Sequence, residues 1–478
     1  HPTWRARRSP STPDAGRLPL AAARCYEDPM TLPPGPRGVV AVARAARDFN
    51  ADPPAFAAAA HERWGPARGL RIGPDRLIFL HDPALIGEVL VEHADAFIKD
   101  KVTRGLSIVL GDGLLTSEGE RWRRSRKVIA PSLSRRHIEH YAAEMVAATR
   151  RHVDRVVDGE IREVHGDMTA LTLDIVVRTL FGSDLPGGHE RIGGLVDAVM
   201  HDFQEVAQSW RRYVPSWVPL AGRRRMRRIS AELEAYIDAL IRERRQRGAD
   251  GDDLLSRLLA AQGADGSAID DAQLRDELAT LFVAGHETTA NALTFALMLL
   301  AEHPEVTAEL VAELDARLGE RDAAAADVAA LARVDAVFKE AMRLYPPAYM
   351  IGREAVREVE IGGWRVDPGT TVLISPWALH HDRRYFPDPE AFRPWRWLDP
   401  AIADLPRNAY MPFGGGPRIC VGNHFALMEG VLCLATILQR LRFERLDRRP
   451  VRTQSAITLR VVGGLRMRAL RRTPPPTR

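Results

Sequence analysis

Cysteine is scarce in this sequence: 478 residues contain only Cys25, Cys420 and Cys433. Three cysteines in so long a chain cannot form the disulfide framework of a small secreted domain, so we expect a protein of the reducing cytoplasm. The chain also has no run of about 18 apolar residues, which excludes an ordinary membrane-spanning helix. The apolar stretch near the N-terminus is too short for the core of a signal peptide.

Charge of one sign does not dominate either. The 67 basic and 63 acidic residues give a net charge of +4, and they alternate along most of the chain. This pattern argues against nucleic-acid binding, which requires basic residues gathered on one face. The content of 45% hydrophobic and 27% charged residues is typical of an ordinary folded protein and excludes a disordered or fibrous one.

The chain divides into a short N-terminal extension and a long folded region. Residues 1–29 are rich in Arg, Pro, Ser and Ala without periodicity, and we expect them to be disordered. Helical periodicity dominates residues 83–345, and the longest helix is predicted over 271–303, where Asp270 and Gln273 have the spacing of a capping box. We therefore expect a mainly α fold with a small β-sheet region, its strands lying at 69–72, 77–80, 356–361, 364–366, 371–374 and 458–462.

The segment 413–422, Phe-Gly-Gly-Gly-Pro-Arg-Ile-Cys-Val-Gly, carries the most information. Its three consecutive glycines suggest a phosphate-binding loop, but the Lys-Ser/Thr ending of such loops is absent. A glycine-rich turn with an inert, buried Cys420 is the simplest alternative. A thiolate ligand needs accessible backbone N–H groups, the start of a helix and a nearby cation. The glycines, the apolar helix predicted after Cys420, and Arg418 supply all three, which favours the ligand.

These residues resemble the haem-binding signature F-x-x-G-x-R-x-C-x-G of the cytochrome P450 superfamily, and of its soluble bacterial haem-thiolate monooxygenases, at every fixed position. The resemblance implies that the cofactor is haem b (iron protoporphyrin IX), with Cys420 as the axial ligand of its iron. It also implies that Arg418 binds a haem propionate and that Phe413 packs beside the sulfur. Thiolate ligation favours cleavage of the O–O bond. Because the resemblance covers residues 30–478, it implies a single catalytic domain over that range.

A second motif of this family is the pair Glu340 and Arg343. Residues three apart on a helix share a face, and an exposed pair of this kind contributes only about 0.2–0.5 kcal/mol. In the family, however, this E-x-x-R pair bonds to an arginine of a later loop, and the resemblance makes Arg396 that arginine. Trp395 stands where the family often has an acid. We assign the glutamate and the two arginines to the structure around the cysteine rather than to chemistry.

The long predicted helix contains Ala-Gly-His-Glu-Thr-Thr at residues 284–289. His-Glu suggests a zinc protease, but the second His that this motif needs four residues after the first is missing. Gly followed by two Thr is poor helix material, and a kinked core helix is the plain alternative. The segment resembles the A/G-G-x-D/E-T-T/S motif that lies over the distal face of the haem in the family. This resemblance implies that Thr288 and Glu287 are catalytic and that Ala284 and Gly285 shape the oxygen pocket.

Other residues match the propionate contacts of the family. Trp122 and Arg126, four apart on a predicted helix, match its W-x-x-x-R motif, and Arg353 matches an arginine of a sheet strand. A planar guanidinium suits this role because it binds carboxylates through two hydrogen bonds. The same predicted helix carries further basic residues, which form either a solvated face or a docking surface for an acidic electron donor. These are Arg123, Arg124 and Lys127.

Substrate-facing positions are expected to be mostly apolar. They are Leu281, Phe282, Ala348, Tyr349, Met350, Ile351 and Ile457, together with residues within 103–115. They include one hydroxyl, on Tyr349, and no evident charge that would bind an acid or an amine. We therefore expect an apolar small-molecule substrate such as a terpenoid, a steroid or a fatty-acyl-like compound. In residues 209–228, Trp and Tyr interleave with Arg, and two prolines favour a mobile cover of the substrate entrance over a membrane-surface helix.

The resemblance implies a haem monooxygenase that inserts one atom of O₂ into the substrate and reduces the other to water. The chain has no segment of flavin or iron–sulfur type, so we expect a monomer that receives electrons from a separate ferredoxin and its NAD(P)H-dependent ferredoxin reductase. Two alternatives stay open: a haem-thiolate peroxygenase or isomerase, and a non-catalytic haem-binding sensor. The Glu287–Thr288 pair disfavours both, because such relatives tend to lack the acid and alcohol, and a sensor does not need them.

Overall fold

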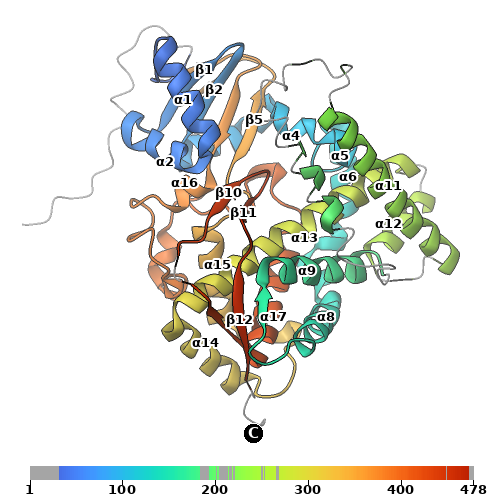
Figure 1. The fold of residues 1–478 in the computed structure, drawn as a ribbon. Helices are drawn as coiled ribbons and strands as arrows, with labels where there is room; N and C mark the ends of the chain where they lie inside the picture. The colour runs from blue at the N-terminus through green and yellow to red at the C-terminus, as the bar shows by residue number, and fades with distance from the viewer. Residues whose placement is uncertain are drawn as a thin grey trace, which may run out of the picture.

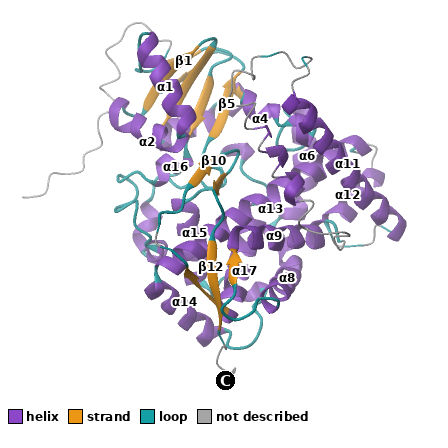
Figure 2. Ribbon diagram, viewed as in Figure 1, coloured by secondary structure: helices purple, strands orange, loops and turns teal. Residues whose placement is uncertain are grey.

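The computed structural model describes residues 32–472, except 183–192, 197, 201, 204–213, 215–217, 219–220, 249–250, 252, 265–268 and 448. The predicted extension at residues 1–29 and half of the segment 209–228 lie outside the described residues. Figures 1 and 2 show that helices make up most of the molecule and that the strands gather in small sheets. The prediction of a mainly α fold with a small β-sheet region is confirmed.

Helices of more than ten residues form the body of the molecule. In the part of the chain that the structure describes, they are α1 (Val39–Ala51), α2 (Pro53–Trp64), α6 (Gly119–Ile129), α8 (Ala142–Asp154), α9 (Val164–Leu180), α11 (Ala221–Arg247), α12 (Leu254–Ala264), α13 (Asp271–Glu302), α14 (Pro304–Arg317), α15 (Ala332–Leu344) and α17 (Asn423–Arg440). Shorter α-helices connect them, namely α3 (Pro83–Gly87), α4 (Lys101–Gly105), α5 (Ser107–Leu110), α7 (Arg135–Ile138) and α16 (Pro376–His380).

The largest sheet lies beside α1 and α2 in Figure 1. Its strands follow the order β1 (Ala67–Ile72), β2 (Asp75–Leu80), β8 (Thr371–Ile374), β5 (Ile351–Ala355) and β3 (Phe97–Lys99), and only the β2–β8 pair is parallel. A three-stranded sheet has the order β4 (Ile161–Glu163), β12 (Arg466–Arg471) and β9 (Leu441–Arg445). Two hairpins complete the described strands: β6 (Val359–Ile361) with β7 (Trp364–Val366), and β10 (Thr453–Ser455) with β11 (Leu459–Val461).

One strand differs from the sequence prediction in a way that matters for the site. The pattern at 356–361 predicts a single strand, whereas the structure has β5 at 351–355 and the short β6 at 359–361. The β5 sequence, Ile-Gly-Arg-Glu-Ala, lacks the apolar alternation of a half-buried strand. It becomes a strand because β8 and β3 pair with it on both sides. This pairing places Arg353 in the sheet.

The helix α13 runs through the centre of the body (Figure 1), and its observed bounds differ from the prediction by one residue. Asp270 caps it, since its Oδ1 accepts a hydrogen bond from the Gln273 N–H at 2.7 Å. The capping box is only half formed, because the Gln273 side chain donates instead to Ser125 Oγ on α6 at 2.9 Å. Most residues of α13 are buried on every side, as expected of a helix that packs against α9, α15 and α17.

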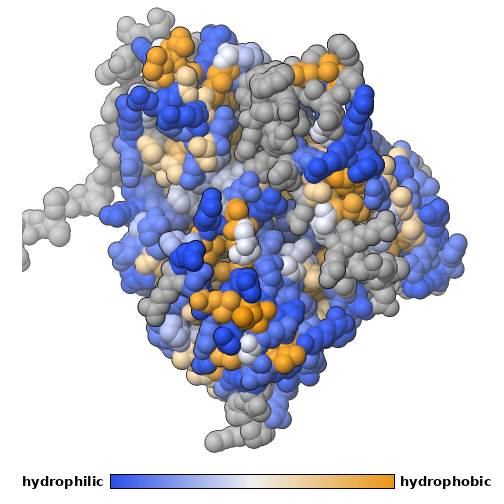
Figure 3. Space-filling view, in the orientation of Figure 1, coloured by the Kyte–Doolittle hydropathy of each residue, from blue (hydrophilic) through white to orange (hydrophobic). Residues whose placement is uncertain are grey.

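The visible face of the molecule is mainly hydrophilic. Figure 3 shows apolar residues on it in small groups, as is usual for the surface of a folded protein. Among the described residues, no helix combines the length and the apolar character that crossing a bilayer requires.

Candidate functional site

A cavity lies between α13 and residues 413–422, which we call the cysteine loop. Its lining gathers segments that are far apart in the sequence. The predicted site residues in this lining are Trp122, Arg126, Leu281, Ala284, Gly285, Glu287, Thr288, Ala348, Met350, Ile351, Arg353, Phe413, Arg418, Cys420 and Ile457. The structure therefore brings the candidate ligand, the candidate acid–alcohol pair and most of the predicted substrate-facing residues to one place.

The cysteine loop holds the sulfur directly before a helix. The Cys420 N–H donates to the Phe413 carbonyl at 3.0 Å, which closes the loop, and α17 begins after Gly422. Glycine is required at position 416, where φ is +67° and a Cβ would lie 1.8 Å from the Leu90 carbonyl oxygen. The side chain of Cys420 is thereby left open to the cavity.

The electrostatic surroundings of Cys420 differ in part from the prediction. Burial raises the pKa of the thiol, while the Gly422 N–H, Arg126 and Lys99 act in the opposite direction. Arg418, expected to be the nearby cation, instead donates to the Ser117 carbonyl at 2.8 Å and pairs with Glu118. A bound metal ion deprotonates a coordinating thiol, so the raised pKa does not oppose ligation.

Four cations gather beside the cavity: Lys99, Arg126, Arg353 and Arg418. Within the described part of the chain, only Arg418 of these four forms an ion pair. Burial, Arg353 and Arg418 lower the pKa of Lys99 to about 7, and burial and Arg418 lower that of Arg353 to about 10. Gathering cations in a shielded place without counter-ions is costly, so the cluster fits an anionic group such as the two haem propionates.

The residues present therefore fit a haem. Cys420 supplies a sulfur ligand, and the cation cluster supplies donors for the propionates. Trp122 completes the cluster, because its ring lies 4.2 Å below the Arg418 guanidinium. Lys99 was missed in the sequence, since it ends the short strand β3 and belongs to no motif that was recognised.

On α13, the two candidate catalytic side chains point in different directions. Thr288 Oγ1 donates to the Ala284 carbonyl at 2.8 Å, and Glu287 Oε1 accepts a hydrogen bond from Thr458 Oγ1 at 2.6 Å. Adjacent helix positions are about 100° apart, so this divergence follows from helix geometry. Gly285 has a further role, because a Cβ there would lie 3.3 Å from the Val176 side chain of α9. Its missing side chain lets α9 pack closely against α13.

Two predicted substrate-facing residues do not line the cavity, and their assignment is corrected. Phe282 is completely buried and packs edge-on against Phe181 and Tyr236, because the helix turns its side chain toward the core. Tyr349 is buried as well, and its hydroxyl donates to the Ala456 carbonyl at 2.6 Å. The hydroxyl expected from Tyr349 is therefore not offered to a substrate.

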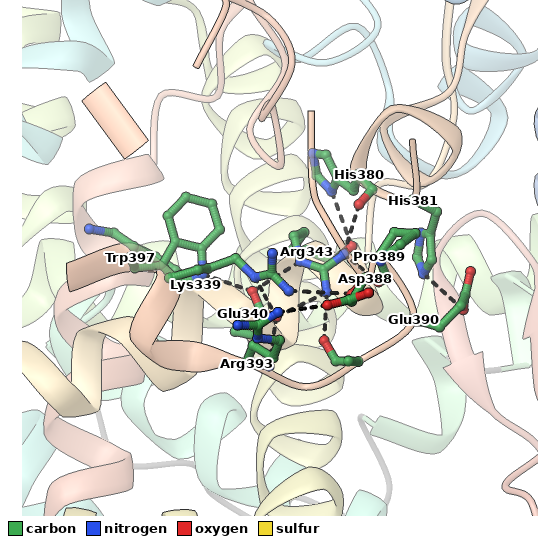
Figure 4. Close-up of polar contacts among 12 residues, drawn as sticks. Lys339, Glu340, Arg343, His380, His381, Asp388, Pro389, Glu390, Arg393 and Trp397 are labelled. Atoms are coloured by element: carbon green, nitrogen blue, oxygen red, sulfur yellow. Dashed lines mark hydrogen bonds and ion pairs between the residues drawn. The ribbon is translucent and has the colours of Figure 1, made fainter. Parts of the chain in front are cut away.

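Glu340 and Arg343 form the centre of a buried polar network (Figure 4). Neither side chain is exposed, and Arg343 donates to both carboxylate oxygens at 2.9 Å. Arg396 Nε donates to the same carboxylate at 3.1 Å, as the resemblance implied. The remaining donors of Arg343 reach backbone carbonyls of the segment that leads to the cysteine loop, namely those of His380, Pro389 and Ala391. The pair is thus a buried ion pair that holds the backbone of this segment in place, and not an exposed pair on a helix surface.

The network contains a donor that sequence reasoning missed. Trp397 Nε1 donates to Glu340 Oε2 at 2.9 Å, and the Arg393 N–H donates to Oε1 at 3.0 Å. Trp395, which stands where the family often has an acid, lies outside the network and packs under Arg333. Trp397 directly follows Arg396 in the sequence, but only the fold brings its ring to the carboxylate.

A buried carboxyl also lies on α17. Glu429 is completely buried, and burial raises its pKa to about 8. Thr289 acts in the opposite direction and lowers this pKa, but by less than burial raises it. The folded protein thus keeps this proton up to about pH 8, whereas the unfolded chain loses it above about pH 4.5. Between these values, its contribution to stability falls as the pH rises, by at most about 1.4 kcal/mol per pH unit.

The variant Glu429→Gln tests this assignment. We expect the free energy of unfolding to fall more steeply in the parent protein than in Glu429→Gln between pH 6 and pH 8. Chemical denaturation at a series of pH values measures both slopes. Glu320→Gln, which changes an exposed glutamate, is the matched control and should keep the slope of the parent protein. Equal slopes for the parent protein and Glu429→Gln would contradict the assignment.

Known proteins resemble this chain over most of its length. The family model for Cytochrome P450 matches residues 33–462. Cyclooctat-9-en-7-ol 5-monooxygenase and cyclooctatin synthase of Streptomyces melanosporofaciens are both 36% identical to this chain, covering 79% and 84% of it and 83% and 89% of their own lengths. Pentalenene oxygenase of Streptomyces avermitilis is 31% identical over 85% of this chain and 90% of its own. The matched residues include the whole cavity lining named above.

Proposed function

Since this chain belongs to the cytochrome P450 family and is a monooxygenase, we propose that it oxidises an apolar terpenoid at the cavity beside Cys420. The observation that carries the proposal is the shared cavity: a cysteine open to it, a cluster of cations beside it, and an acid and an alcohol on α13. A haem b bound to Cys420 would supply reductive activation of O₂ and transfer of one oxygen atom to the substrate.

The chain's own residues support this chemistry in distinct ways. The haem propionates would be held by Arg126, Arg353, Arg418 and Lys99, and the iron would be held by Cys420. Leu281, Ala348 and Met350, with their apolar neighbours, exclude water and orient the substrate. Thr288 presents a hydroxyl to the cavity, and Glu287 carries protons to it from the other side. These roles place proton supply and substrate binding on different faces of one cavity.

The choice of a terpenoid rests on the lining and on the relatives. The apolar side chains of the lining are mainly leucine, methionine, isoleucine and alanine, which suit a bulky hydrocarbon. The names of the relatives, cyclooctat-9-en-7-ol 5-monooxygenase, cyclooctatin synthase and pentalenene oxygenase, point to terpenoid substrates. Binding-induced shifts of the Soret band across a library of terpenoids, steroids and fatty acids test the choice. Tightest binding by fatty acids or steroids would contradict it.

We further propose that electrons come from a cytoplasmic ferredoxin and its NAD(P)H-dependent reductase. The helix α6 connects surface and site, because Trp122 and Arg126 line the cavity while Arg123, Arg124 and Lys127 are exposed. An acidic ferredoxin that docks on these cations would lie next to the cysteine loop, whose Ile419 carbonyl accepts from Arg126 at 2.8 Å.

Charge reversal on α6 tests the docking surface. In Arg124→Glu/Lys127→Glu, we expect the KM for an acidic ferredoxin to rise by roughly tenfold at low salt, since opposite charges steer association. Peroxide-driven turnover should not change, because it needs no ferredoxin. Steady-state kinetics at two salt concentrations measure the effect. An unchanged KM would exclude this face as the docking surface.

Thr288 and Glu287 are proposed to keep oxygen reduction coupled to product formation. Removing a group that assists proton transfer typically costs about 10²–10⁴-fold in rate, but ordered water can replace part of a lost hydroxyl. We therefore expect Thr288→Ala and Glu287→Gln to keep the haem content and the carbon monoxide spectrum. Their product per NADPH should fall by roughly tenfold, with peroxide formed instead. Unchanged coupling in both variants would favour the peroxygenase or isomerase alternative.

A further inference from the structure

Glu287 accepts a hydrogen bond from a side chain that lies outside the motifs quoted above. Its Oε1 accepts a hydrogen bond from Thr458 Oγ1 at 2.6 Å, and both groups are at least nine-tenths buried. Thr458 lies in the hairpin between β10 and β11, next to α13 in Figure 1. The other carboxylate oxygen, Oε2, accepts no hydrogen bond from the part of the chain that the structure describes. Glu287 is thus tied to the hairpin by one oxygen, and its second oxygen is free to act in the cavity.

Thr458 is held in turn by two further residues. Asn291, one helical turn after Glu287 and completely buried, donates from Nδ2 to Thr458 Oγ1 at 3.3 Å. The oxygen of the same amide lies 3.1 Å from Nε2 of His165, a half-buried residue in the first turn of α9. Because an amide oxygen only accepts, His165 Nε2 must carry the hydrogen. The hydrogen bonds from His165 to Asn291, to Thr458 and to Glu287 form a line, and this line joins three elements: α9, α13 and the β10–β11 hairpin.

The hydrogen bonds of this line all point the same way. His165 donates to Asn291, Asn291 donates to Thr458, and the single hydroxyl hydrogen of Thr458 is left for Glu287. A carboxylate is the natural end of such a line, since it accepts only. An amide group does not pass protons on near neutral pH, so the line fixes orientation and does not conduct protons.

We propose that Thr458, held by Asn291 and His165, is a positioning residue that orients the Glu287 carboxylate for proton supply to the cavity. The inference rests on the proposed role of Glu287. It adds that this role requires a hydroxyl on the β10–β11 hairpin and a hydrogen-bond donor at the start of α9. Proton supply thus depends on the hydrogen bonds that join α13 to α9 and to the β10–β11 hairpin. Neither His165 nor Thr458 belongs to the family motifs quoted above.

Isosteric substitutions distinguish the effect of losing the Thr458 hydroxyl from the effect of changing the volume of the side chain. In Thr458→Val, we expect product per NADPH to fall by roughly threefold to tenfold, with peroxide formed instead, which is less than full loss of an acid–base group costs. Thr458→Ser keeps the hydroxyl and should restore most of the coupling. The matched control is Thr453→Val, an exposed position on β10 of the same hairpin. All variants are compared as haem-loaded protein with equal Soret absorbance.

The other end of the line is tested in the same way. In His165→Leu we expect a smaller loss of coupling, about twofold, because Asn291 keeps its bond to Thr458. His165→Gln offers an amide N–H at a similar reach and should restore coupling. His140→Leu, which changes an exposed histidine whose Nδ1 contacts only its own turn at 3.1 Å, is the control.

Infrared spectroscopy gives a readout that does not depend on turnover. The difference between the parent protein and Glu287→Gln assigns the carboxylate bands of Glu287. We expect Thr458→Val to shift these bands, because the carboxylate loses a donor, and Thr458→Ser and Thr453→Val to leave them in place. Unshifted bands in Thr458→Val would overturn the inference.

The outcomes distinguish this inference from the function on which it rests. If Glu287→Gln lowers coupling while Thr458→Val behaves like the parent protein, the positioning role is wrong and the role of Glu287 stands. If Thr458→Val and Thr458→Ser lower coupling equally, the hydroxyl is not the cause, and the inference also fails. If Glu287→Gln leaves coupling unchanged, the proposed proton supply itself is wrong.

Discussion

Replacing Cys420 with serine or histidine is expected to abolish both the red-shifted Soret band of the reduced carbon monoxide complex and NADPH-driven turnover. Only a thiolate gives the iron the electron donation that favours O–O cleavage. Cys420 has the position for this role, since it is open to the cavity and lies in a loop whose Gly416 cannot be replaced without a collision with the Leu90 carbonyl. Absorption spectra of the dithionite-reduced protein under carbon monoxide measure the first effect directly.

Cys433 provides the control for this prediction. It is completely buried on α17, where its sulfur lies 3.3 Å from Thr149 Oγ1 and burial raises its pKa strongly. Cys433→Ser should therefore keep the red-shifted band and most of the turnover. The ligand assignment would be wrong if the band survived in Cys420→Ser or vanished in Cys433→Ser.

Glu340→Gln is expected to destabilise the fold by about 3–5 kcal/mol, the usual cost of breaking a buried ion pair from one side. The amide is almost isosteric with the carboxyl, so the loss of stability comes from the missing charge and not from a change in volume. It leaves Arg343 buried without a counter-ion and weakens the bonds from Arg396 and Trp397. We expect the variant to bind haem poorly, because the Glu340 network holds the backbone of the segment before the cysteine loop in place.

The neighbouring residue Lys339 supplies a matched control. Its ammonium pairs with Asp335 at 2.6 Å, but both side chains are about one-third exposed, so the pair contributes about 0–1 kcal/mol. Lys339→Met should unfold within about 1 kcal/mol of the parent protein and should bind haem normally. Denaturant titrations and haem content measure both variants. Equal stability of Glu340→Gln and Lys339→Met would contradict the role of Glu340.

The features predicted from the sequence are those set by local pattern. The periodicity and cap of α13 gave its bounds to within one residue, because Asp270 and Pro304 act on their own neighbours. The i, i+4 spacing put Trp122 and Arg126 on one side of α6, and both line the cavity. The cysteine loop belongs to the same class, since its glycines and cysteine are contiguous.

The features that were missed are set by contacts between distant segments. Helical spacing alone does not say which face of α13 meets the cavity, so Phe282 was assigned to the substrate although it faces Phe181. Lys99 and Thr458 approach the site only after β3 and the β10–β11 hairpin have packed. No local pattern around Thr458 predicts a hydrogen bond to a glutamate 171 positions away.

The measurement that tests the central claim most directly is product formation under ¹⁸O₂, with NADPH, a surrogate ferredoxin and its reductase, on a terpenoid that shifts the Soret band. We predict that each product molecule gains one ¹⁸O atom, that the Cys420→Ser variant forms none, and that peroxide is not required. Product that forms only with added peroxide, or whose new oxygen comes from water, would contradict the assignment as an O₂-dependent monooxygenase.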